Sequence, residues 1–326
     1  MCKVSVIVPV YKVARFIERC ARSLFEQTLQ DIEFIFVDDA TPDASISIMQ
    51  TVLAEYPNRI EQVKLITHEC NKGLPAARNT GLRIALGEYV FHCDSDDFVE
   101  TDMLEKLYNT AKDEKVDIVW CDWFLSFEKN ERYMKQPQYL SAMEALKGML
   151  TGAMKYNVWN KLVKRDLYQK HQIKFPDGYG MGEDMTMIML FAYAGKIKYI
   201  PQAFYHYVKL NGNAFSQTYS EHHLVELKYN TQRIVEFIQK EFVHTLDKEL
   251  SFFKLDVKFP FLVAGSKAKY RLWKEWYTEA NSYILQNVNV SLRSRLLQWF
   301  AWKNQYWVVW IYTHVILKVV YGIIYK

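Results

Sequence analysis

Three acids in four residues follow an apolar run within the segment YVFHCDSDDFV, residues 89–99. The strand-like residues 89–91 lead almost directly into Asp94, Asp96 and Asp97. Two carboxylates about 4 Å apart repel by about 4 kcal/mol at an effective dielectric near 20. A divalent cation removes this repulsion, and Mg²⁺ held by one or two carboxylates usually completes its shell with phosphate oxygens. The cluster therefore predicts a metal–diphosphate site, and a solvated turn is the simpler alternative.

A second acidic pair and two basic residues could also take part in binding a ligand. Asp38 and Asp39 end the apolar segment EFIFVDD, and Lys72 and Arg78 lie on either side of Gly73 in NKGLPAARNTG. The acids either open an ordinary turn or accept a hydrogen bond from the base or ribose of a nucleotide. The basic residues are either surface cations or the partners of its phosphates.

The elements that must position these residues alternate between strand and helix over the first 120 residues. The expected strands, read from apolar runs, are 4–10, 33–39, 63–66, 89–93 and 117–120. Near-continuous apolar strands separated by helical periods predict a parallel sheet covered by helices. Ligands of such sheets bind at the carboxyl ends of the strands, where the acidic segments fall. We expect the helix that starts near Pro75 to stop at Gly87.

Later segments add one more acidic pair and exclude the common phosphate loops. Glu183 and Asp184 follow the glycine-rich GYGMG and open an apolar helical segment. Residues 221–286 have helical periodicity. The chain has no Gly-x-x-x-x-Gly-Lys-Ser/Thr motif and no dinucleotide-binding glycine fingerprint after a strand.

Four of these motifs, in order, resemble those of the family 2 glycosyltransferases. They are the opening segment VSVIVPVYK…VDDATPD, then NKGLPAARNTGL, GEYVFHCDSDDFV and GEDM, and the resemblance covers roughly residues 3–215. It implies the GT-A (nucleotide-diphospho-sugar transferase) fold, an α/β, Rossmann-like, mostly parallel sheet flanked by helices. We therefore expect a GT-A catalytic domain at 1–220, with a nucleotide-sugar half (1–120) and an acceptor half (121–220). A helical C-terminal region, 221–326, would follow.

The resemblance also implies roles in binding the donor. The residues expected to hold the nucleotide-sugar are Pro9, Tyr11, Asp39, Arg78, Asp94 and Ser95. Asp39 would lie near the N3–H of the base, usually uracil, and Arg78 would reach the nucleotide. Asp94 and Asp96 would ligate Mn²⁺ or Mg²⁺. Ala40 stands where the family more often has glycine.

Asp184 is the catalytic base that the resemblance implies. Inverting transfer needs one base to take the proton of the acceptor hydroxyl and a metal to stabilise charge on the departing diphosphate. An α-linked UDP-sugar would yield a β-glycoside. Glu183 and the segment Trp159-Asn160-Lys161 would lie near a saccharide or lipid-linked saccharide acceptor, although a buried tryptophan is an equal alternative.

Two other functions fit parts of the pattern. A nucleotidyltransferase of related fold should carry a glycine-rich basic loop after its first strand, and VPVYKVARF has none. A non-catalytic nucleotide-sugar-binding protein would be expected to lack Asp96 or Asp184, and both are present. A glycosyltransferase of bacterial surface polysaccharide synthesis is the preferred interpretation.

The basic character of the chain lies in its C-terminal tail, because no Asp or Glu follows residue 279 while five Lys or Arg residues do. The tail contributes +5 to the net charge of +4, and the remainder sums to −1. This placement argues against a general nucleic-acid surface. The apolar, tryptophan-rich segment 306–325 could span a bilayer, lie in the interface of an anionic membrane, or pack as an ordinary helix. We favour the interface. Five cysteines without a Cys-x-x-Cys pair, and no signal-peptide pattern, predict a cytoplasmic protein on the inner face of the membrane.

Overall fold

The structure is a computed structural model that describes residues 2–210 and 220–317. The chain forms two compact units, one of residues 1–145 with 156–234 and the other of residues 146–155 with 235–326. Helix α8 (Glu221–Glu241) begins at the domain boundary expected from the sequence, and the division between the units falls within this helix.

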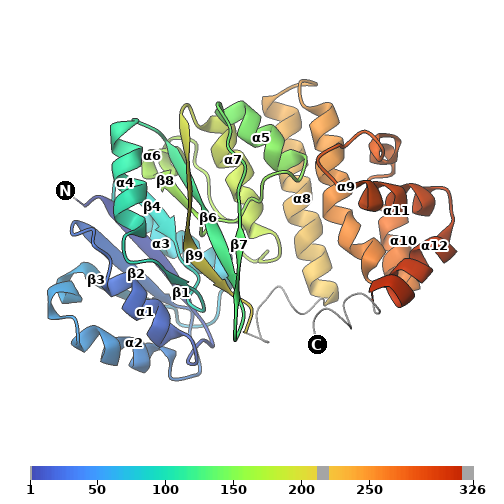
Figure 1. The fold of residues 1–326 in the computed structure, drawn as a ribbon. Coiled ribbons are helices and arrows are strands. Elements are labelled where there is room, and N and C mark those ends of the chain that lie inside the picture. The colour runs from blue at the N-terminus through green and yellow to red at the C-terminus, as the bar shows by residue number, and fades with distance from the viewer. Residues whose placement is uncertain (1, 211–219, 318–326) are drawn as a thin grey trace. The chain divides into compact units, whose positions relative to one another are not determined.

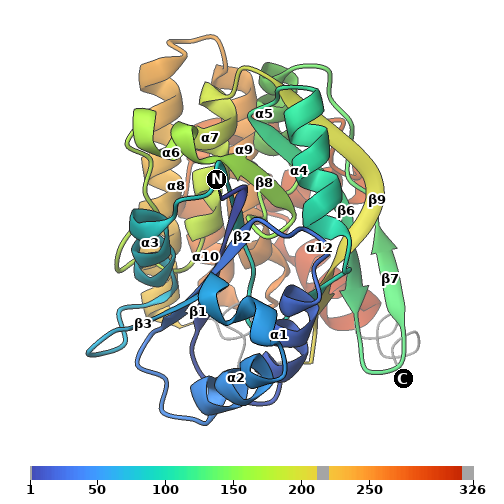
Figure 2. The ribbon, with the colours of Figure 1, turned by 90° about the vertical axis from the view of Figure 1, so that its left-hand side faces the viewer.

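The first unit is built on one mixed sheet (Figures 1 and 2). Its strands are β1 (Val4–Val10), β2 (Ile32–Asp38), β3 (Val63–Thr67), β4 (Tyr89–His92), β5 (Phe98–Val99), β6 (Ile118–Ser126), β7 (Glu131–Met134), β8 (Lys161–Lys164) and β9 (Ile197–Val208). They lie in the order β3-β2-β1-β4-β8-β6-β9-β5, and β7 pairs with β6. Strands β3, β2, β1 and β4 are parallel to their neighbours in this series, as the apolar runs predict, and every residue of β1 and β2 is buried.

Antiparallel pairing begins where the sheet passes out of this parallel region. Strand β8 is antiparallel to both β4 and β6, whereas β6 and β9 are parallel. Strand β6 continues to Ser126, beyond the expected segment 117–120, because its later residues pair with β9 and with β7. The sequence thus predicted strands β1 to β4 more completely than the rest of the sheet.

The helices of the first unit are α1 (Ile17–Phe25), α2 (Ser45–Ala54), α3 (Leu74–Ile84), α4 (Met103–Asp113), α6 (Arg165–Lys170) and α7 (Thr186–Tyr193). Helix α5 (Ala142–Leu150) crosses the division between the units. Helix α3 packs on β1 and β2, and at Gly81 the approach is so close that a β-carbon there would overlap Ile7. It ends at Ile84 rather than Gly87, because the Leu86 and Gly87 amides donate to Glu33 and Ser5 of neighbouring strands.

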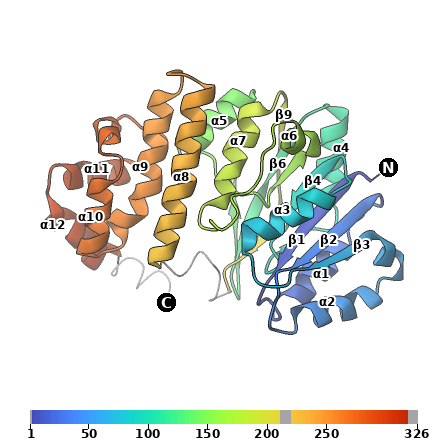
Figure 3. The ribbon, with the colours of Figure 1, turned by 180° about the vertical axis from the view of Figure 1, so that it is seen from behind.

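The second unit is helical (Figure 3). Its helices are α9 (Asp247–Val263), α10 (Lys267–Glu275), α11 (Leu292–Trp302) and α12 (Tyr306–Ile311), which continues into a π-helical turn (Tyr312–Ile316). Among the residues that the structure describes, no helix is long and apolar enough to cross a membrane. The expected tail helix lies partly outside the described residues, from position 318 onward.

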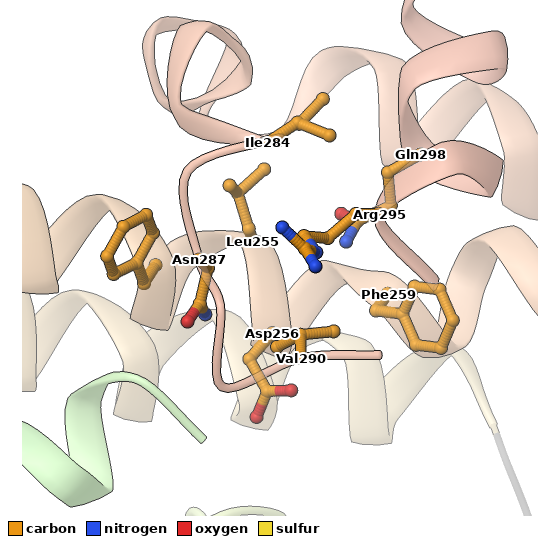
Figure 4. Close-up of a pocket in the computed structure, with 9 residues that line it drawn as sticks. Leu255, Asp256, Phe259, Ile284, Asn287, Val290, Arg295 and Gln298 are labelled. Atoms are coloured by element: carbon orange, nitrogen blue, oxygen red, sulfur yellow. The ribbon is translucent and has the colours of Figure 1, made fainter. Parts of the chain in front are cut away.

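A small cavity lies between parts of α9 and α11 in this unit (Figure 4). Its volume is about 20 Å³, enough for one water molecule. Arg295 and Gln298 line it, and within the described residues Arg295 Nε and Gln298 Oε1 are buried without a hydrogen-bond partner. A single ordered water is the ligand that this volume and these two atoms fit.

Candidate active site

The sheet brings three of the predicted segments to one edge. Strand β1 lies between β2 and β4, and all three run in the same direction, so their carboxyl ends adjoin. Pro9 lies near the end of β1, and Tyr11 follows it. Asp39 follows β2, and Asp94 and Ser95 follow β4.

Asp39 is buried and is held by three nitrogen atoms. Its Oδ1 accepts from the backbone amide of Lys72 at 2.8 Å and lies 2.7 Å from Nδ1 of His68. Its Oδ2 accepts from the backbone amide of Gly73 at 2.8 Å. Gly73 has φ of +87°, a conformation that suits glycine, and it directly precedes α3. The carboxylate is thus fixed against the loop that starts this helix.

The turn beside Asp39 leaves one aromatic ring open to solvent. Ala40 has φ of +53°, which explains why a glycine is more usual at this position. Asp38 closes the turn by accepting from the Thr41 amide at 2.8 Å, and the Thr41 hydroxyl accepts from the Lys12 amide at 2.8 Å. Tyr11 is 39% exposed next to this turn, so its aromatic surface is open to a planar group.

One guanidinium joins the two acidic motifs of the sequence. Arg78 is almost completely buried, its Nη2 donates to Asp94 Oδ1 at 2.8 Å, and its Nε lies 3.4 Å from Glu183 Oε1. The turn after β4 and the acidic pair before α7 therefore converge. Contact of Arg78 with a nucleotide stays a prediction, because the side chain is buried and contacts the two carboxylates.

The third acid of the cluster has a different environment. Asp97 has no exposed surface, and it accepts from the Tyr205 hydroxyl and from the Val208 amide, both at 2.7 Å. The Tyr205 oxygen also accepts from the Asp94 amide at 3.1 Å. Burial first, and then the nearby charges of Asp96 and Asp94, raise the pKa of Asp97 well above its ordinary value. Asp97 therefore ties the turn after β4 to β9.

At the acidic pair before α7, burial disfavours the charged carboxylates more than the opposite charge of Arg78 favours them. Gly182, with φ of +88°, precedes the 3₁₀ turn Glu183–Met185 that holds both acids. Burial raises the pKa of both carboxyl groups, and repulsion from Asp184 adds to the effect on Glu183. Arg78 acts in the opposite direction on both groups. A carboxyl group whose pKa is raised is a better proton acceptor once it is ionised.

The predicted acceptor segment forms part of an aromatic cluster. The Trp159 ring stacks on Tyr205 and Tyr207, with ring centroids 4.5 and 5.3 Å apart. Asn160 and Lys161 have no exposed surface, so direct contact with an acceptor needs neighbouring groups to move. The Lys161 ammonium donates to the carbonyl of Asn157 at 2.6 Å, and burial lowers its pKa to about 7.

A divalent cation fits the donor atoms that are present. Within the described residues, no group of three or more His, Cys, Asp or Glu side chains is placed to hold a metal. A Mg²⁺ or Mn²⁺ ion bound through one or two carboxylates and a diphosphate does not need such a group. Asp94 keeps one carboxylate oxygen outside its bond to Arg78, and Asp96 is partly exposed on the same turn.

Two residues of this region were missed by the sequence reasoning. His68 follows β3 directly, as Asp39 follows β2, so its place at a strand end was an available signal. Tyr205 lies within β9, and nothing in its sequence context shows that its hydroxyl meets the turn after β4.

Comparisons with known proteins agree with this fold and these motifs. The family model for glycosyl transferase family 2 matches residues 5–184. A relative named uncharacterized glycosyltransferase EpsJ, from Bacillus subtilis, is 34% identical over 66% of this chain and 63% of its own length. The chain thus spans less than two thirds of that relative.

Two solved structures share the fold. One is TarS 1–349 of S. aureus in complex with UDP-GlcNAc, with a TM-score of 0.69, 20% identity and coverage of 95% of this chain and 91% of that one. The other is the mannosyltransferase PcManGT of Pyrobaculum calidifontis with GDP-Man and Mn²⁺, with a TM-score of 0.51, 17% identity and coverage of 95% and 86%. The fold is thus that of GT-A glycosyltransferases, and the chain belongs to glycosyl transferase family 2.

Proposed function

We propose that this protein is a metal-dependent, inverting glycosyltransferase that takes a hexose or N-acetylhexosamine from a UDP-sugar. Its acceptor would be a saccharide or lipid-linked saccharide of a bacterial surface polysaccharide, and the new bond would be a β-glycoside. The observation that carries this proposal is the convergence of the Asp94 turn and the Glu183-Asp184 pair on Arg78. Asp39 follows β2 and Asp94 follows β4, on either side of β1, at the same edge of the sheet. Glu183 joins them through its contact with Arg78.

The donor would lie across the carboxyl ends of β1, β2 and β4. Tyr11 and Pro9 would contact the base, with Asp39 accepting its ring N–H. Asp94 and Ser95 would lie next to the ribose and diphosphate. The complex of TarS with UDP-GlcNAc supports a donor of this class, since that protein has the same fold.

Asp94 and Asp96 are the residues that would hold Mn²⁺ or Mg²⁺. A bound cation would stabilise the negative charge that develops on the departing diphosphate. The Mn²⁺ complex of PcManGT supports this choice of ion. The chain itself would keep the turn rigid through Asp97 and Tyr205, which hold it to β9.

Asp184 would take the proton from the acceptor hydroxyl as its oxygen attacks the anomeric carbon. Glu183, next to it, would lie near the acceptor and contacts Arg78. The Trp159 ring would border the acceptor site, and Asn160 and Lys161 would support it from within the protein. One base and one metal site suffice for inversion.

The C-terminal unit would attach the enzyme to the inner face of the membrane. Its aromatic–basic surface consists of exposed residues of α11, α12 and their continuations: Leu292, Arg293, Leu296, Trp302, Lys303, Trp307, Trp310, Ile311, Val315 and Ile316. Arg293 lies 5.6 Å from the Tyr312 ring, which brings the start of α11 next to the end of α12. Exposed tryptophans with basic neighbours and no acids suit the interface of an anionic bilayer.

Flotation with vesicles tests this attachment. The full chain should float with phosphatidylglycerol vesicles and much less with phosphatidylcholine vesicles. Replacing both Trp307 and Trp310 by serine should weaken binding at least about tenfold. The control carries serine at Leu86 and Leu140, two exposed apolar residues of the first unit, and should bind normally. Equal binding of the tryptophan variant would refute the proposed surface.

Turnover of a panel of UDP-sugars tests the activity. With Mn²⁺ and no acceptor, the wild-type protein should slowly hydrolyse its preferred UDP-sugar, which would also identify the sugar. Asp96→Ala should abolish this hydrolysis. Hydrolysis that survives in this variant would contradict the metal assignment, and no turnover of any nucleotide-sugar by the wild type would contradict the enzymatic proposal.

A further inference from the structure

A chain of hydrogen bonds leads from the protein surface to Asp39. The exposed Arg83 donates through Nη2 to the Thr80 hydroxyl oxygen at 2.9 Å. The same oxygen lies 2.9 Å from Nε2 of His68, whose Nδ1 lies 2.7 Å from Asp39 Oδ1. Thr80, His68 and Asp39 are all buried.

The contacts of this chain fit an arrangement of protons in which Thr80 donates to His68 and His68 donates to Asp39. Because the Thr80 oxygen accepts from Arg83, its own proton is available to His68 Nε2. Nε2 then accepts, so the proton of a neutral imidazole lies on Nδ1 and is donated to Asp39. The ring is thus oriented by Thr80 with its N–H directed at the carboxylate.

Three donors leave Asp39 one direction in which to act. An ionised carboxylate has about four acceptor positions and no proton to donate. The His68 ring and the Lys72 amide occupy Oδ1, and the Gly73 amide occupies one position on Oδ2. The remaining position on Oδ2 can only accept a hydrogen bond.

We propose that His68, oriented by Thr80, is a positioning residue that keeps Asp39 a pure acceptor and so makes the donor site select bases with a ring N–H. Uracil and guanine have this group, whereas cytosine and adenine present an unprotonated ring nitrogen at the same edge. That nitrogen would face a carboxylate oxygen, two acceptors without a proton between them. The proposal rests on the proposed function in one respect, that Asp39 faces the base.

Removing the His68 donor should loosen this selection. With one donor fewer, the Asp39 carboxylate can rotate, so that its open Oδ2 position is no longer fixed toward the ring N–H of uracil. The quantity to measure is the ratio of the dissociation constants of CDP and UDP, in the presence of Mn²⁺. Because both nucleotides are measured on the same sample, partial unfolding of a variant cancels in the ratio.

Three near-isosteric variants separate the two ring nitrogens. His68→Asn keeps an amide donor close to the position of Nδ1 and should retain the wild-type ratio within about threefold. His68→Gln moves the donor to the position of Nε2 and should lower the ratio about tenfold, the effect of one hydrogen bond. Thr80→Val removes the hydroxyl that orients the ring and should lower it in the same direction.

Asp39→Asn separates failure of this inference from failure of the proposed donor site. If Asp39→Asn weakens UDP binding while His68→Gln and Thr80→Val leave the ratio unchanged, the role of His68 is overturned and the donor site stands. If Asp39→Asn leaves UDP binding unchanged, both are overturned. A ratio that falls in His68→Gln but not in His68→Asn supports the inference.

Discussion

Two groups of carboxylates lie at this edge of the sheet, and their charges are compensated in opposite ways. Asp39 is met by three nitrogen donors, two of them backbone amides. Asp94 and Glu183 share one guanidinium, and Asp184 lies next to Glu183. The first arrangement leaves one acceptor position on Asp39 Oδ2, which suits a single hydrogen bond from a neutral ligand. The second has more negative charge than Arg78 neutralises, so it suits a cation and a reaction that consumes a proton acceptor.

Glycosyl transfer should depend most strongly on the second group of carboxylates. Asp184→Asn should lower the turnover number for glycosyl transfer by about a thousandfold, because the amide cannot take the acceptor proton. Binding of UDP with Mn²⁺, measured by calorimetry, should change little. Full transfer by this variant would show that Asp184 is not the base. The two groups of carboxylates would then not differ in a catalytic role.

The same substitution at the first group, Asp39→Asn, should affect stability. Asp39→Asn replaces one acceptor oxygen by an amide nitrogen, which leaves a buried backbone or ring N–H without its partner. We expect unfolding in urea to show a loss of about 2 kcal/mol. An unchanged free energy of unfolding would mean that the three donors find other partners and that the site is not as fixed as its geometry indicates.

Glu183→Gln should change stability in the other direction, and only at higher pH. The pKa of Glu183 is raised in the folded protein, so wild-type stability falls as pH rises from the ordinary carboxyl range through the folded pKa. Without nucleotide or metal, the variant should be more stable than the wild type at pH 8 by about 1 kcal/mol. At pH 4 the two proteins should be similar. Destabilisation at pH 8 would show that Arg78 compensates Glu183 fully.

The smallest effect concerns the turn beside Asp39. Ala40 has φ of +53°, where an L-residue with a β-carbon is strained. Ala40→Gly should raise the free energy of unfolding by about 0.5–1 kcal/mol, partly offset by the greater freedom of glycine in the unfolded chain. UDP affinity should not change. A loss of UDP affinity would show that the strained turn helps to orient Asp39.

The sequence predicted the strands and motifs because their signals are local. Strands β1 and β2 are near-continuous apolar runs, and Asp39 and Asp94 follow strand ends, where the backbone direction alone places them. The partners of these acids could not be predicted in the same way. Arg78 is 16 residues from Asp94 but 105 from Glu183, and Tyr205 is 111 from Asp94.

The roles within the acidic cluster also depended on tertiary structure. Asp94, Asp96 and Asp97 are equivalent as residue types, and burial together with the Tyr205 and Val208 contacts sets Asp97 apart. Antiparallel pairing of β8 was likewise hidden, because a short apolar run does not show which neighbours it will have. Local pattern therefore placed the carboxylates, and long-range contacts distinguished them.

In the proposed mechanism, the turn after β4 would hold a cation together with a nucleoside diphosphate. Free Mn²⁺, followed by its electron paramagnetic resonance signal, measures this directly in the presence of UDP. The wild type and the control Asp102→Asn should remove Mn²⁺ from solution when UDP is added. Asp102 is a half-buried acid on another turn, where it pairs with Lys106. Asp96→Asn should bind it at least about tenfold more weakly. Equal Mn²⁺ binding by Asp96→Asn and the wild type would contradict the account.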